Sequence, residues 1–181
     1  MINYETIKNN PTQFLAMTSM KTKEFEYLLC NFEPHWENYH RYFTLMGKRR
    51  KRPVFDEYSN DSLPGAANKL FFLVLYLKIY TLQQCHSALF GISQGKTSRM
   101  VKILQPLLDK TLSDIGCMPS SNPEDIQHML EQSQAKAITV DATERSIPRA
   151  TDYSVQEEYY SGKKKDHTVK NNILATDWQE I

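Results

Sequence analysis

Apolar residues recur at helical spacing along most of this chain, and the pattern changes to that of a strand only near residue 137. Segment 21–43 carries two apolar sets separated by Pro34, which predicts two helices with Pro34 at the start of the second. The run 68–80 is apolar on nearly every side and predicts a helix that is buried over most of its surface. These segments together indicate a small helical core.

Two shorter amphipathic segments follow and are separated by Gly91. Thr81 and Gln84 match a capping box, and the helix that they begin is expected to turn four residues toward the core: Leu82, Cys85, Leu89 and Phe90. Ser93 is expected to cap a further helix, whose apolar stripe comprises Met100, Val101, Leu104, Leu107 and Leu108. Two helices joined by a tight turn that contains glycine, preceded by a buried helix, predict a helix-turn-helix.

In a helix-turn-helix the second helix enters the major groove of DNA, with its N-terminal residues nearest to the bases. We expect base contacts from Gln94, Lys96 and Arg99, with Lys102 one turn further on, and phosphate contacts from Ser93 and Ser98. The alternative is an ordinary amphipathic helix pair, which also begins with polar residues. Residues 91–97 resemble a phosphate-binding loop, but their glycines are one residue too close and no strand is predicted before them, so nucleotide binding is rejected.

A different pattern begins after residue 121. Asn122, Pro123 and the acidic pair that follows predict the start of a helix, and apolar residues 137–140 then predict a short strand that ends in Asp141. A carboxylate at a strand end is well placed to bind a divalent cation, but two-metal phosphoryl transfer needs several converging carboxylates. As an isolated residue, Asp141 would more often be a turn residue or a cap.

The sequence around Asp141 resembles that of a known family. Residues 141–149 (Asp-Ala-Thr-Glu-Arg-Ser-Ile-Pro-Arg), 159–165 (Tyr-Tyr-Ser-Gly-Lys-Lys-Lys) and 167–171 (His-Thr-Val-Lys-Asn) resemble the first catalytic block of insertion-sequence transposases of the DDE superfamily. The helix-turn-helix resembles the one that precedes their catalytic domain. The resemblance implies a ribonuclease H-like endonuclease domain in which two Asp and one Glu hold Mg²⁺ or Mn²⁺, and Asp141 matches the first Asp, as catalytic residue and metal ligand. Ala142 stands where the family usually has glycine.

The same resemblance implies that four lysines lie near the DNA backbone: Lys163, Lys164, Lys165 and Lys170. It also places His167 in the strand that follows. In the family the second Asp and the Glu come later, at positions that this sequence does not contain, and Asp177 and Glu180 are interpreted as turn residues. We therefore expect a C-terminally truncated chain that lacks two of the three catalytic carboxylates and is catalytically incompetent by itself.

Charge is unevenly distributed, although the formal net charge is only +1. Residues 41–52 contain six basic residues and no acidic one. Such a block suits a polyanion because neutralised phosphates release counterions, so Arg49 and Arg50 join the expected DNA contacts; the alternative is a solvated charge run. The three cysteines are widely spaced and predict no disulfide framework. No apolar run reaches the roughly 20 residues of a membrane span and no secretory signal begins the chain, so a cytoplasmic protein without membrane contact is expected.

The sequence thus predicts an α+β protein in which an all-α helix-turn-helix region precedes the first strands of an incomplete ribonuclease H-like domain. The expected divisions are a helical segment at 1–46, a basic linker rich in Pro and Gly at 47–67, the helix-turn-helix at 68–118 and the start of the endonuclease domain at 123–181. The predicted function is that of the N-terminal portion of a transposase that binds double-stranded DNA at terminal inverted repeats. Its expected partner is a downstream-encoded C-terminal half or a full-length transposase. The alternative is a non-catalytic regulator or inhibitor derived from a transposase, which binds the same DNA.

Overall fold

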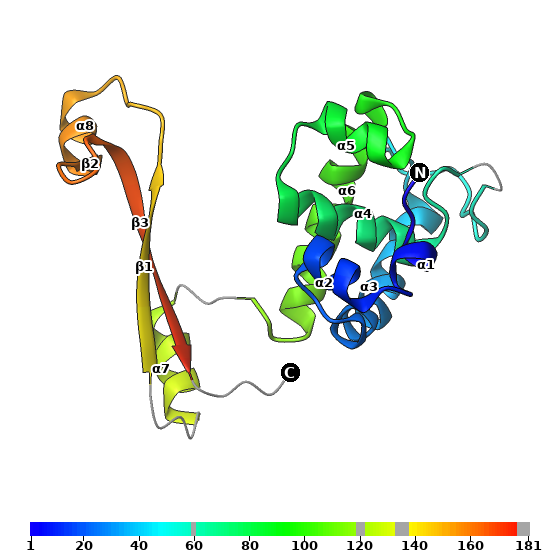
Figure 1. Ribbon diagram of the computed structural model, residues 1–181, viewed down its shortest axis with the longest axis horizontal. Helices are drawn as coiled ribbons and strands as arrows, with labels where there is room; N and C mark the ends of the chain where they lie inside the picture. The colour runs from blue at the N-terminus through cyan, green and yellow to red at the C-terminus, as the bar shows by residue number, and fades with distance from the viewer. Residues whose placement is uncertain (59–60, 119–121, 133–137, 177–181) are drawn as a thin grey trace. The chain divides into compact units, whose positions relative to one another are not determined.

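The computed structural model describes residues 1–58, 61–118, 122–132 and 138–176, and it divides the chain into two compact units (Figure 1). The first unit is Met1–Pro119 and the second is Ser120–Ile181. The domain divisions expected near residues 46 and 67 and between residues 118 and 123 stay predictions.

The regular elements among the described residues of the first unit are helices, apart from an isolated bridge between Phe43 and Arg49. Its six helices are α1 (Tyr4–Ile7), α2 (Pro11–Thr18), α3 (Thr22–Tyr42), α4 (Gly65–Ile79), α5 (Gln83–Phe90) and α6 (Gln94–Asp114). The central helix α4 contacts α1, α2, α3 and α6, and every side chain from Leu70 to Leu75 is buried. This confirms the prediction of a helix buried on most sides, although Leu77 and Ile79 at its C-terminal end are exposed.

One continuous helix, α3, occupies the segment in which we expected two helices, so the expected break at Pro34 is wrong. Proline lacks a backbone N–H and costs about 3 kcal/mol inside a helix. The helix continues because residues on both sides of Pro34 belong to one buried stripe. Phe32 and Trp36 flank the proline in this stripe, and both are buried in the same core as Phe25 and Leu28.

The orientation of α5 also differs from the prediction. The helix begins at Gln83 with the apolar Leu82 as its N-cap, so the predicted capping box at Thr81 is wrong. Of the four residues expected in the core only Phe90 is buried, whereas Leu82 is 76% exposed and Cys85 and Leu89 are exposed as well. His86 lies on the buried face instead. Its ring centroid lies 4.5 Å from that of Phe72, and its Nε2 lies 3.1 Å from the Phe72 carbonyl oxygen.

The turn between α5 and α6 has the predicted features. Gly91 ends α5 with φ of 63°, a left-handed conformation that favours glycine, and a Cβ there would clash with the sulfur of Met1. The Ser93 side chain caps α6 by accepting a hydrogen bond of 3.2 Å from the Lys96 backbone N–H. The predicted stripe of α6 is confirmed: Met100, Val101, Leu104 and Leu108 are buried, and Leu107 is partly buried.

The described residues of the second unit combine two helices with a three-stranded antiparallel sheet. Its elements are α7 (Pro123–Gln132), β1 (Ile138–Ser146), α8 (Tyr153–Tyr159), β2 (Tyr160–Ser161) and β3 (Asp166–Thr176), with strand order β1-β3-β2. β3 matches the strand expected at 167–175. Asp141 lies inside β1, opposite Ile173, and not at a strand end as expected, because pairing with β3 extends β1 to Ser146. The whole chain is therefore α+β.

Candidate nucleic-acid interface

The N-terminal end of α6 presents most of the polar residues that the sequence selected. Ser93, Gln94 and Lys102 are exposed, and Ser98 and Arg99 are half-buried. Gln94 donates a hydrogen bond of 2.9 Å from Nε2 to Oε1 of Gln83, which links the first turns of α5 and α6. Apart from Ser93, whose side chain caps the helix, these residues lie on the part of α6 that a helix-turn-helix inserts into the major groove.

Lys96 differs from its neighbours because its charge is already neutralised within the protein. Its Nζ lies 2.9 Å from Oδ1 of Asp61 and 3.4 Å from Oγ of Ser62. The second carboxylate oxygen of Asp61 lies 3.1 Å from Nζ of Lys69. The sequence pattern did not indicate a role for Asp61, because an acidic residue between Asn60 and Pro64 is ordinary in a loop.

Lys69 is fully buried in α4 and is surrounded by compensating groups. Its Nζ lies 2.8 Å from Oε1 of Glu57 and 4.6 Å from the ring centroid of Trp36, and it also donates a hydrogen bond to the Leu63 carbonyl oxygen. Burial by itself would raise the pKa of Glu57 and Asp61. The Lys69 ammonium and the hydrogen bonds that both carboxylates accept outweigh burial, so the pKa of each lies below its ordinary value.

The basic segment 43–52, here called the basic turn, is folded against the end of α3. Phe43 pairs with Arg49 in an antiparallel bridge, and Nε of Arg50 donates hydrogen bonds of 3.1 and 3.0 Å to the carbonyl oxygens of His40 and Phe43. Arg50 is half-buried and satisfies the C-terminal carbonyl groups of α3. Arg49, by contrast, is exposed, as are Lys48, Lys51 and Arg52.

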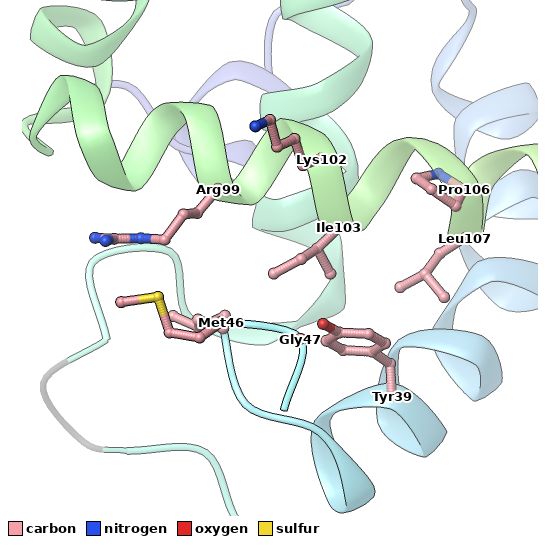
Figure 2. Close-up of a pocket in the computed structure, with 9 residues that line it drawn as sticks. Tyr39, Met46, Gly47, Arg99, Lys102, Ile103, Pro106 and Leu107 are labelled. Carbon is pink, nitrogen blue, oxygen red and sulfur yellow. The ribbon is translucent and has the colours of Figure 1, made fainter. Parts of the chain in front are cut away.

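An open groove of about 440 Å³ separates the basic turn from α6 (Figure 2). One wall is formed by Tyr39 and the tip of the basic turn, and the other by a single stripe of α6: Arg99, Lys102, Ile103, Pro106 and Leu107. These positions are three or four residues apart and therefore share one helical face. The structure thus places two predicted DNA contacts of α6, Arg99 and Lys102, across the groove from the tip of the basic turn, although they lie about 50 positions apart in the chain.

In the second unit, Asp141 is exposed and its Oδ1 accepts a hydrogen bond of 2.8 Å from the backbone N–H of Ala142. The carboxylate of Glu144, three positions further along β1, lies 3.8 Å from Nζ of Lys170 and accepts a hydrogen bond from Ser161. Lys163, Lys164 and Lys165 are exposed in the turn between β2 and β3, and Lys170 is exposed on β3, which also contains His167.

A metal site is not assembled by these side chains. Within the described residues no group of three or more His, Cys, Asp or Glu side chains is placed to hold a metal ion. Asp177 and Glu180 lie outside the described residues. One exposed carboxylate by itself does not fit Mg²⁺ or Mn²⁺, which need several converging oxygen ligands.

Comparison with known families supports the helix-turn-helix. Residues 62–114 match the helix-turn-helix of DDE superfamily endonuclease. The match spans α4, α5 and α6, and it confirms the motif predicted from Gly91, Ser93 and the apolar stripes. No curated protein and no solved structure matches the chain. In the part of the chain that the structure describes, no helix is both long enough and apolar enough to span a membrane.

Proposed function

We propose that this chain binds duplex DNA through α6 and acts as the DNA-binding portion of a transposase of the DDE superfamily. The observation that carries the proposal is the match of residues 62–114 to the helix-turn-helix of that superfamily. The exposed polar end of α6 and its Ser93 cap support it, because this end of a recognition helix meets the base edges. The proposed target is the terminal inverted repeat of a mobile element.

The structure allows distinct roles to be proposed for the residues of α6. Gln94 and Arg99 are the proposed readers of base edges, since glutamine pairs with adenine and arginine with guanine in the major groove. Ser93 and Ser98 are proposed to contact phosphates. Lys96 holds the first turn of α6 to Asp61, so its ammonium reaches DNA only by leaving that ion pair.

DNA binding is common to both functions that the sequence leaves open, a transposase and a regulator derived from one. Asp141 as a catalytic metal ligand stays a prediction, because the described residues contain no group of three or more His, Cys, Asp or Glu side chains placed to hold a metal ion. The lysines of the turn between β2 and β3 are proposed to contact the DNA backbone irrespective of sequence, since phosphate contacts carry no base information.

The proposal is tested by selecting duplexes from a random library with the full chain and measuring the affinity of variants for the selected duplex. Replacement of Gln94 or Arg99 by alanine should weaken binding to the selected duplex by about 5- to 150-fold, the equivalent of about 1–3 kcal/mol for one base-specific pair, and should relax the base preference. Gln105→Ala is the matched control, because Gln105 is exposed on the same helix about 16 Å beyond Gln94. Failure of the wild-type chain to enrich any duplex would contradict the proposed function.

A further inference from the structure

The groove beside α6 lies where a strand of a bound duplex must cross the helix. α6 has 21 residues and is therefore roughly 30 Å long, whereas the major groove is only about 12 Å wide. When the N-terminal residues of α6 reach the bases, the helix must pass the bordering sugar–phosphate strand further along. The distance along the helix from Ser93 to Lys102 is about 13 Å, which places this crossing beside Lys102.

The chemistry of the groove matches such a strand. Ile103, Pro106, Leu107 and Tyr39 give its two walls apolar surfaces, and Figure 2 shows the charged groups of Arg99 and Lys102 directed away from Tyr39 and Leu107. The exposed Lys48 and Arg49 follow Gly47 in the chain but are not among the residues that line the groove. None of the described residues that line the groove is acidic. Apolar walls with cations at the α6 edge complement a chain in which deoxyribose alternates with phosphate.

We propose that this groove binds the sugar–phosphate backbone of the duplex whose bases α6 reads, with deoxyribose against Pro106 and Leu107 and with phosphate near Lys102. The inference rests on the proposed function and adds a second contact that is independent of base sequence. Charge complementarity favours DNA over an apolar protein segment as the occupant of the groove. An apolar segment would remove water from the cationic groups without neutralising their charge.

The test measures the affinity of the full chain for the selected duplex and for an unrelated duplex over a series of salt concentrations. Lys102→Ala should reduce the slope of log affinity against log salt by about 1 for both duplexes, because one phosphate contact is lost. Met46→Glu adds an anion to the exposed wall of the groove and should weaken binding to both duplexes at least tenfold. The matched controls are Lys110→Ala, which removes an exposed cation further along α6, and Met118→Glu, which alters an exposed methionine outside the groove. Circular dichroism verifies that each variant folds.

The outcomes separate this inference from the proposed function. Binding by Lys102→Ala and Met46→Glu that equals that of the wild type, while Gln94→Ala still loses the selected duplex, would overturn the inference and leave the function standing. A change in oligomeric state with Met46→Glu at unchanged DNA affinity would also overturn it, in favour of a second copy in the groove. If the wild-type chain binds no duplex at all, both proposals are wrong.

Discussion

At the residue scale, the most consequential side chain is the buried Lys69. Its ammonium lies between Glu57 and Asp61, and Asp61 in turn pairs with Lys96 on α6. Charges therefore alternate along a chain of four residues, so each is compensated even where solvent is excluded. Removing one partner of such a pair leaves an uncompensated buried charge. The resulting loss of stability is larger than the stability that the intact pair contributes.

Replacement of Lys69 by methionine should lower the free energy of unfolding by about 3–5 kcal/mol at neutral pH. The folded-state pKa values of Glu57 and Asp61 lie below their ordinary 4.5 and 3.8, so their stabilising effect is complete above those values and is lost as the pH falls through the lowered ones. The difference between wild type and variant should therefore shrink in acid. Urea titrations at neutral and acidic pH measure it; a constant difference would contradict this account.

His86 provides a second test that depends on pH. Burial lowers the pKa of His86 to about 4, against an ordinary value of 6.5, and its Nε2 faces a carbonyl oxygen. Because the unfolded chain binds the proton more readily, stability is complete above pH 6.5 and falls as the pH drops toward 4. We expect a loss of roughly 2 kcal/mol by about pH 4.5.

The His86→Leu variant should lose stability at neutral pH but should lack the decline between about pH 6.5 and 4.5. Chemical denaturation at several pH values in this window measures both effects. An identical decline in the variant would assign the acid sensitivity to other groups.

At the element scale, α3 and α5 show how tertiary packing overrides local signals. Pro34 is a helix-start signal in the sequence, yet the buried stripe from Phe25 to Trp36 keeps α3 continuous through it. In α5 the core takes His86, and not Leu82 or Leu89, because the imidazole can pair with the carbonyl group of Phe72. Hydropathy alone would not predict that a histidine is buried while two leucines of the same segment are exposed.

Pro34→Ala should stabilise the protein. Pro34 is exposed, so the substitution removes little packing, and alanine restores the backbone N–H that proline lacks inside a helix. An increase of about 1–3 kcal/mol in the free energy of unfolding is expected, and Glu33→Ala at the neighbouring exposed position serves as the control. A lower unfolding midpoint in Pro34→Ala would show that the proline is required for packing.

At the scale of the whole molecule, the two units carry different groups of basic residues. The helix-turn-helix and the basic turn belong to Met1–Pro119, and the turn with Lys163, Lys164 and Lys165 belongs to Ser120–Ile181. If the first unit reads the base sequence, base preference should survive changes to the second unit, whereas the total electrostatic attraction to DNA should not.

Simultaneous replacement of Lys163, Lys164 and Lys165 by alanine should weaken DNA binding by the full chain without changing which duplex it selects. The slope of log affinity against log salt should decrease in magnitude by up to about 3, roughly one for each phosphate contact removed. Competition between selected and unrelated duplexes measures the preference. An altered preference would place these lysines, or the second unit, in base recognition.

The local sequence by itself determined the helix-turn-helix, because its signals act within a few residues: the left-handed Gly91, the Ser93 cap and the stripe of α6. It also predicted β3, although it placed Asp141 at a strand end. Only the tertiary structure decided the rest, since the groove lies between the basic turn and α6, and the ion pairs join Glu57 and Asp61 to α4 and α6. Such contacts join residues far apart in the chain, and neither residue spacing nor composition encodes which distant groups will compensate one another.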